Sequence, residues 1–147
     1  MSFKKKFSEK SQESNSPAVV KTPPTSVAFI HNFLDEYGLD PYEFRIYAHM
    51  VRRTGGKTDG VCFASLKKIA KICDMSVRKA QQALKLLINA QLLKQDKRDG
   101  RTDLYKVTPA SEWAASEELE KIREAVADGK DVVVNPDGSV VIEEVKT

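Results

Sequence analysis

The chain has 147 residues, of which 41% are hydrophobic and 31% are charged, a composition that suits one small domain with polar tails. Its two cysteines, Cys62 and Cys73, form no CxxC pair, and neither histidine stands at a ligand spacing from them. We therefore expect no metal site and no disulfide-bonded secreted fold. No run of 18 apolar residues is present and no apolar segment follows the basic N-terminus, so the sequence predicts a cytoplasmic protein without a membrane partner.

The net charge of +3 conceals a strong division along the chain. Residues 38–108 contain 15 Lys and Arg against 7 Asp and Glu, a net charge of +8, whereas residues 109–147 contain 4 against 10, a net charge of −6. Residues 1–37 contain 5 against 4 and are nearly neutral. This division predicts a polyanion-binding region with an acidic appendage.

Composition and pattern divide the chain into three segments. Residues 1–26 include the polar stretch SEKSQESNSP and the stiff KTPPT, so they predict a disordered basic and polar arm. Residues 27–108 carry the helical and strand patterns of a folded domain. Residues 109–147 predict an acidic helix with a hairpin, which serves dimerisation or packs on the domain.

The folded domain begins with an extended segment and a short helical turn that ends at Gly38. Asp40 is a favoured N-cap, Pro41 suits the first helical position and Glu43 completes a capping box, so a helix is expected from there to the Thr54-Gly55-Gly56 stop. The side chains expected against the core in this part are Phe29, Ile30, Phe33, Leu34, Phe44, Tyr47, Ala48 and Val51.

Two further helices follow, each beginning after a serine cap. Ser65 precedes LKKIAKIC and Ser76 precedes VRKAQQALKLLINAQ, with a break at Asp74-Met75 between them. The inward residues expected are Leu66, Ile69, Ala70 and Cys73 in the first helix, and Ala80, Ala83, Leu84, Leu87 and Ile88 in the second. Small residues at Ala70, Ala80 and Ala83 let two helices cross closely, as in a helix-turn-helix.

Beyond Leu92 the pattern changes to strands. LLKQDK and DLYKVT flank Asp99-Gly100, which predicts a β-hairpin. Residues 110–128 predict an amphipathic helix, and DVVVNPDGSVVIEE predicts a C-terminal hairpin. The expected fold is mainly α with small β: a winged helix-turn-helix with a three-helix core and a hairpin wing, followed by the amphipathic helix and the second hairpin.

The outward face of the third core helix has no acidic residue, unlike an ordinary solvated face, which mixes both charge signs. Arg can pair with guanine and Gln with adenine in the major groove, so this face predicts base contacts. The DNA-binding residues expected on it are Ser76, Val77, Arg78, Lys79, Gln81, Gln82 and Lys85.

Two further basic groups flank this face. The hairpin tip offers Lys97, Arg98 and Arg101 to the adjacent groove or backbone. The preceding helix is expected to contact phosphates through Ser65, Lys67, Lys68 and Lys71, although solubility alone would explain these lysines equally well.

The stretches 38–53 and 60–94 resemble the winged-helix domains of bacterial plasmid and phage replication proteins. The matching positions are Cys62-Phe63, Ser65, Ile69-Ala70, Ser76, Leu84 and Gln91-Leu92-Leu93. The resemblance implies a winged-helix fold that binds DNA, and related domains also regulate transcription. Two positions depart from the pattern: Gln91 stands before the first wing strand and Asp74 stands in the turn, where glycine is usual.

We therefore expect a double-stranded DNA-binding protein of replication initiation or transcription regulation, nucleoid-associated when bound. The alternative is a protein-interaction module that uses the acidic segment, whose apolar seam at Ala115, Leu119, Ile122 and Val126 either pairs with a second copy or packs on its own domain. A third possibility is autoinhibition, in which the acidic segment folds over the basic face. With no phosphate loop and no nucleophile motif, no enzymatic activity, cofactor or small-molecule substrate is expected.

Overall fold

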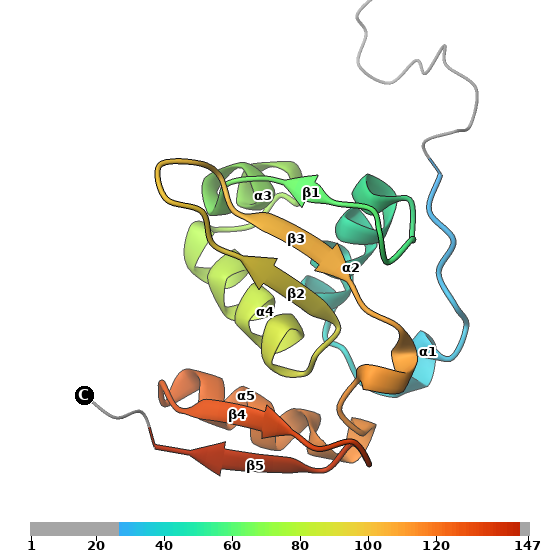
Figure 1. Cartoon of the computed structure of the whole chain (residues 1–147), viewed down its shortest axis with the longest axis vertical. Coiled ribbons are helices and arrows are strands. Elements are labelled where there is room, and N and C mark those ends of the chain that lie inside the picture. Colours follow the sequence, from blue (N-terminus) through green and yellow to red (C-terminus); the bar gives the residue numbers. More distant parts are fainter. Residues whose placement is uncertain (1–26, 145–147) are drawn as a thin grey trace, which may run out of the picture.

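The computed structural model describes residues 27–144, and the arm expected at residues 1–26 lies outside this range. Figure 1 shows two layers: helices α2, α3 and α4 with a three-stranded sheet, and below them helix α5 with a two-stranded sheet. Within the described range, no helix has the length and apolar character needed to cross a membrane.

The first helices follow their local signals. α1 (Leu34–Tyr37) ends at Gly38, which has the left-handed backbone that glycine favours. α2 (Pro41–Thr54) begins with the expected capping box: the Asp40 carboxylate accepts from the Glu43 amide at 2.8 Å, and the Glu43 carboxylate accepts from the Asp40 amide at 2.9 Å. Both sequence predictions are confirmed.

The expected core contacts of this part are partly wrong. Leu34 is buried, but Phe29 and Phe33 are 86% and 44% exposed. α2 packs against α4 and the sheet, so it buries a wider arc than a single stripe, while the expected Phe44 and Ala48 are only half-buried. The apolar residues of α2 that are fully in the core are Ile46, Tyr47, Met50 and Val51.

The helix pair forms as predicted. α3 (Leu66–Ile72) and α4 (Val77–Asn89) are capped by Ser65 and Ser76, whose hydroxyl oxygens accept from the amides of Lys68 and Lys79 at 3.1 and 3.0 Å. Asp74 takes a left-handed backbone (φ 58°) between the two helices.

The inward residues of this pair are mostly those expected. Ile69, Ala70, Cys73, Ala80, Ala83, Leu84 and Leu87 are buried, Leu66 and Ile88 are half-buried, and Leu86 is an additional core residue.

Three short strands make an antiparallel sheet in the order β1-β3-β2: β1 (Cys62–Phe63), β2 (Leu93–Asp96) and β3 (Leu104–Val107). β2 and β3 form the predicted hairpin, with Leu93 opposite Val107 and Asp96 opposite Leu104. The hairpin therefore follows directly after α4 in the chain.

The single helix expected over residues 110–128 is wrong. Two 3₁₀ turns (Ala110–Glu112 and Ser116–Glu118) precede α5 (Leu119–Ala127), and the chain between the turns is extended. Burial of Trp113 explains the break: its indole Nε1 donates to Thr108 Oγ1 at 3.1 Å, its ring meets Tyr47 edge-on, and the neighbouring Ala114 amide donates to the carbonyl of Ala90.

The chain closes with β4 (Asp131–Val134) and β5 (Val140–Glu143), the expected C-terminal hairpin. α5 lies along α4 and buries Leu119, Ile122 and Ala125. One continuous apolar cluster runs from Leu34 to Val140, so both layers share a single core.

Candidate nucleic-acid interface

Helix α4 presents the polar face that the sequence predicted. Of the seven residues expected to bind DNA, six are exposed: Ser76, Val77, Arg78, Gln81, Gln82 and Lys85. α4 contains no acidic residue, and within residues 27–144 no ion pair is found for Arg78 or Lys85. This face therefore carries positive charge and free hydrogen-bonding groups.

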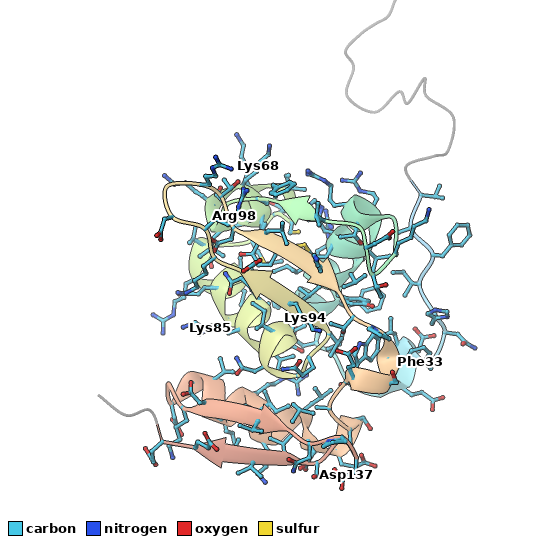
Figure 2. All side chains as sticks on the ribbon, in the orientation of Figure 1. Phe33, Lys68, Lys85, Lys94, Arg98 and Asp137 are labelled. Atoms are coloured by element: carbon cyan, nitrogen blue, oxygen red, sulfur yellow. The ribbon has the colours of Figure 1, made fainter. Side chains whose placement is uncertain are left out.

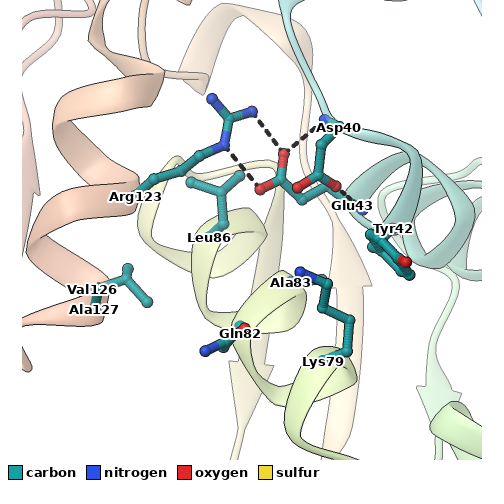
Figure 3. A pocket seen from close by; sticks show the side chains of 10 residues that line it. All are labelled: Asp40, Tyr42, Glu43, Lys79, Gln82, Ala83, Leu86, Arg123, Val126 and Ala127. Carbon is teal, nitrogen blue, oxygen red and sulfur yellow. Dashed lines mark hydrogen bonds and ion pairs between the residues drawn. The ribbon is translucent and has the colours of Figure 1, made fainter. Parts of the chain in front are cut away.

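Lys79 has a different position from the other six. It is half-buried, and its Nζ lies 4.6 Å from the centre of the Tyr42 ring in a cation–π contact. Figure 3 shows Lys79 and Gln82 on the wall of a pocket between α4, the start of α2 and α5. Lys79 thus belongs to the flank of α4, and Gln82 lies at the border between this flank and the exposed face.

The tip of the β2–β3 hairpin has two exposed cations, Lys97 and Arg101. Arg98 is half-buried because its guanidinium stacks on the Phe63 ring at 4.7 Å and its Nε donates to the carbonyl of Thr102 at 2.9 Å. Arg98 therefore braces the hairpin against β1, while part of its charge stays on the surface. Figure 2 shows Arg98 and Lys68 toward the same end of the molecule.

The start of α3 and the hairpin tip lie close together. Ser65 and Leu66 line one side of an open hollow, and the segment from Gly100 to Asp103 lines the other. Lys67, Lys68 and Lys71 are all exposed on α3. The structure thus brings together the expected backbone-contact residues and the hairpin cation Arg101.

Two features of α2 lie beside the helix pair and were not among the predicted site residues. Arg45 Nη2 donates to the carbonyl of Ile72 at 3.2 Å, so α2 holds the last turn of α3 next to the helix-turn-helix bend. Arg52 and Arg53, in the last turn of α2, are exposed. The sequence signal for them is the basic last turn of a helix, which the helix dipole alone also explains.

His49 lies in the same helix and is only 2% exposed, and its Nε2 has no hydrogen-bond partner. Burial above all, together with the positive charges of Arg52, Arg53 and Arg45, lowers the pKa of His49 to about 4. The imidazole is therefore neutral near pH 7. Among residues 27–144, no group of three His, Cys, Asp or Glu side chains is arranged to hold a metal ion.

An ion pair between the partly exposed Arg123 and the buried Glu43 joins the acidic segment to α2 (Figure 3). Arg123 donates from Nε and Nη2 to the two carboxylate oxygens of Glu43, at 3.0 and 2.7 Å, and from Nη2 to the carbonyl of Gly38 at 2.5 Å. The hydrogen bonds to Glu43 raise the pKa of the guanidinium. Glu43 had been predicted only as part of a cap, and nothing local in the sequence indicates a partner 80 residues away.

The position of α5 bears on the expected dimer seam and on autoinhibition. Leu119 and Ile122 are buried within the chain, so the seam packs on its own domain, as one of the two alternatives had it. Arg78 and Lys85 remain exposed with α5 in place, so the acidic segment does not cover these two cations, and autoinhibition, the third possibility, stays untested.

Residues 37–93 match a family model described as a helix-turn-helix domain. The match runs from the end of α1 to the first residue of β2 and includes both α3 and α4. No curated protein and no solved structure matches the chain. Residues 37–93 are therefore similar to a helix-turn-helix domain, the structure adds small antiparallel sheets to it, and such a domain suggests binding to double-stranded DNA.

Proposed function

We propose that the chain binds double-stranded DNA as a winged helix-turn-helix, with α4 in the major groove and the β2–β3 hairpin as the wing. The observation that carries the proposal is the exposed face of α4, which has cations and amides, no carboxylate, and the cationic hairpin tip nearby. The element order α2-β1-α3-α4-β2-β3 supports the winged form, because it puts the hairpin directly after the second helix of the pair.

The side chains on this face suit base edges. Arg78 and Lys85 can donate to the acceptors of guanine, and Gln81 can pair with adenine through its amide. Val77 is 45% exposed in the first turn of α4, where its methyl groups can contact the methyl group of thymine. Gln82 can reach the groove only from its edge position, and Lys79 is engaged by Tyr42.

The remaining cations suit the phosphate backbone. Lys67, Lys68 and Lys71 on α3, with Lys97 and Arg101 on the hairpin, would fix the position of the duplex without reading its sequence. We further propose that the protein acts by binding alone, without catalysis, in replication initiation of the plasmid or phage type or in transcription regulation. The resemblance of residues 38–53 and 60–94 to replication-protein winged helices supports this role.

Selection of bound sequences from a random duplex library tests the proposal. We expect a defined consensus. Arg78→Ala should lower the affinity for this consensus about 5- to 150-fold, the range for one lost base contact of 1–3 kcal/mol, and should remove the preference at one base position. Lys68→Ala is the matched control, because a lost phosphate contact should weaken all sequences alike.

Two outcomes would count against this assignment. An Arg78→Ala protein with the wild-type consensus would remove the base-reading role of that residue. Failure of the wild-type chain to enrich any duplex, together with no salt-dependent binding to DNA, would contradict the proposed function and favour an interaction module.

A further inference from the structure

A second group of cations lies outside the α4 face, at the end of the molecule opposite α5. Arg52 and Arg53 extend from the last turn of α2, Lys68 from α3 and Arg98 from the hairpin. The ion pairs within residues 27–144 involve Lys94, Arg123 and Lys130, and none involves this group.

The elements that carry these side chains meet at β1, since α2 contacts this strand and β3 of the hairpin pairs with it. Burial raises the pKa of the Cys62 thiol, and the positive charges of Arg53, Arg52 and Lys68 all oppose that rise. Arg98 stacks on the ring of Phe63, the next residue along the strand, which is itself 45% exposed. We call Arg52, Arg53, Lys68 and Arg98 the β1 patch; it is continuous with the hairpin on one side and ends at α2 on the other.

The β1 patch gathers like charges without a partner in the described range. The helix dipole of α2 accounts for Arg52 and Arg53 at its end, but it does not account for the approach of Lys68 and Arg98 from two other elements. The carboxylates of α5, β4 and β5 are in the other layer of the molecule (Figure 1). A polyanion would relieve the repulsion, and the polyanion already present in the proposed function is DNA.

We propose that the β1 patch is a phosphate-contact site that shares Lys68 with the α3 contacts and, through Arg52 and Arg53, extends the bound duplex beyond α4 and the hairpin tip. This inference rests on the proposed function. The patch offers cations and no amide or acidic side chain, so it contacts the backbone and does not select bases. It raises the affinity for any sequence, provided that the duplex is long enough to reach it.

The test compares two duplexes that contain the selected sequence, one of about 12 base pairs and one of about 30, since each base pair adds about 3.4 Å. On the long duplex, Arg52→Gln/Arg53→Gln should reduce the slope of log affinity against log salt by about 2, because each phosphate contact contributes about 0.9. The loss should be equal for selected and scrambled sequences. On the short duplex, the variant and the wild type should bind alike.

The matched control is Lys94→Gln/Lys130→Gln, which removes the same two charges from sites paired with glutamates. This control should keep the wild-type slope. Arg52→Lys/Arg53→Lys, which preserves the charge, should also keep most of it. Thermal unfolding of each variant verifies that a change in binding is not a loss of folding.

An Arg52→Gln/Arg53→Gln protein whose salt-dependence slope equals that of the control would overturn the inference. These arginines would then serve only to stabilise the end of α2. A loss confined to cooperative binding at high protein concentration would also overturn it, because the patch would then contact a second copy. If the wild type binds neither duplex, the proposed function itself fails, so the two failures are distinguishable.

Discussion

The molecule has a basic layer, made of α2, α3, α4 and the three-stranded sheet, and an acidic layer, made of α5, β4 and β5. The cations of α4 and those of the acidic layer have different surroundings. On α4, Arg78 and Lys85 point to solvent with no ion pair in the described range. In the acidic layer, Lys121 donates to the carbonyl of Val140, Arg123 binds Glu43 and Lys130 pairs with Glu144. The exposed face of α4 therefore keeps these two charges available for a partner, whereas the acidic layer uses its described cations to hold itself together and to the rest of the chain.

The largest expected effect comes from removing the acidic layer. A chain that ends at Pro109 lacks Trp113, Leu119 and Ile122, and each such buried side chain contributes about 1.5–3 kcal/mol. It also removes Arg123, the partner of the Glu43 carboxylate. Because a small domain has only about 5–15 kcal/mol of stability, we expect loss of cooperative unfolding in circular dichroism.

A chain that ends at Glu144 is the control, since it keeps every described residue and should melt like the full chain. If the chain ending at Pro109 instead melts normally and binds DNA more tightly, the acidic layer is an autoinhibitor and the shared core is not essential.

The next effect concerns the contact between the layers. Arg123→Met leaves the Glu43 carboxylate, 5% exposed, without its partner, and should lower the free energy of unfolding by about 3 kcal/mol in urea titrations. Glu43→Gln/Arg123→Met should recover much of this loss, because Gln is neutral and can still accept from the Asp40 amide. Glu124→Gln, an exposed neighbour on α5, should change stability little.

Equal losses in the single and double variants would contradict the view that an unpaired charge causes the effect. The layers would then be joined by apolar packing alone, through Leu86 of α4 and the buried side chains of α5.

The buried His49 of the basic layer predicts how the stability of the chain depends on pH. The pKa of His49 is lowered to about 4 from an ordinary value of 6.5, so the unfolded chain binds this proton more readily than the folded chain. Above pH 6.5 this difference does not affect the free energy of unfolding. As the pH falls below 6.5 the free energy of unfolding decreases, and at pH 4 the decrease is about 3 kcal/mol. His49→Met should therefore reduce the difference in unfolding free energy between pH 7 and pH 4 by about that amount.

His31→Gln is the matched control, since His31 is exposed, and it should leave the wild-type pH dependence in place. If His49→Met retains the full pH dependence, other groups cause it, and the positive surroundings of His49 are weaker than the geometry indicates.

Local signals account for what the sequence predicted well. The caps at Asp40, Ser65 and Ser76 and the turn at Asp99-Gly100 depend on residues within a few positions, and all formed as expected. The polar face of α4 followed from its helical period. Periodicity also predicts where the buried stripe of a helix lies. It underestimated the width of the buried face of α2, because α4 and the sheet both cover this helix.

Long-range contacts account for what the sequence did not show. Trp113 breaks the expected helix because its ring and indole nitrogen are satisfied in the core between Thr108 and Tyr47. Arg123 finds Glu43 across 80 residues. Arg98 of the hairpin stacks on the ring of Phe63. Each of these depends on packing that no local pattern specifies.

The smallest expected effect compares the helix ends of the two layers. α3, α4 and α5 close with the same pair of hydrogen bonds, for example from the amide of Leu92 to the carbonyl of Leu87 and from that of Gln91 to that of Ile88. The left-handed residue is Gly129 after α5, but Asp74 and Gln91 after α3 and α4, with φ of 72°, 58° and 70°. The basic layer therefore contains backbone strain that the acidic layer avoids.

Gln91→Gly should raise the free energy of unfolding by about 0.5–1 kcal/mol, because glycine relieves the left-handed strain at some cost in unfolded-chain entropy. Asp74→Gly should gain less, since aspartate tolerates this conformation better. Gly129→Gln is the matched reverse, with nothing within 4 Å of an added Cβ, and should lose a similar amount. If both Gln91→Gly and Gly129→Gln destabilise the chain, the packing of the residue 91 side chain outweighs its backbone strain. The helix ends of the two layers then do not differ in strain energy.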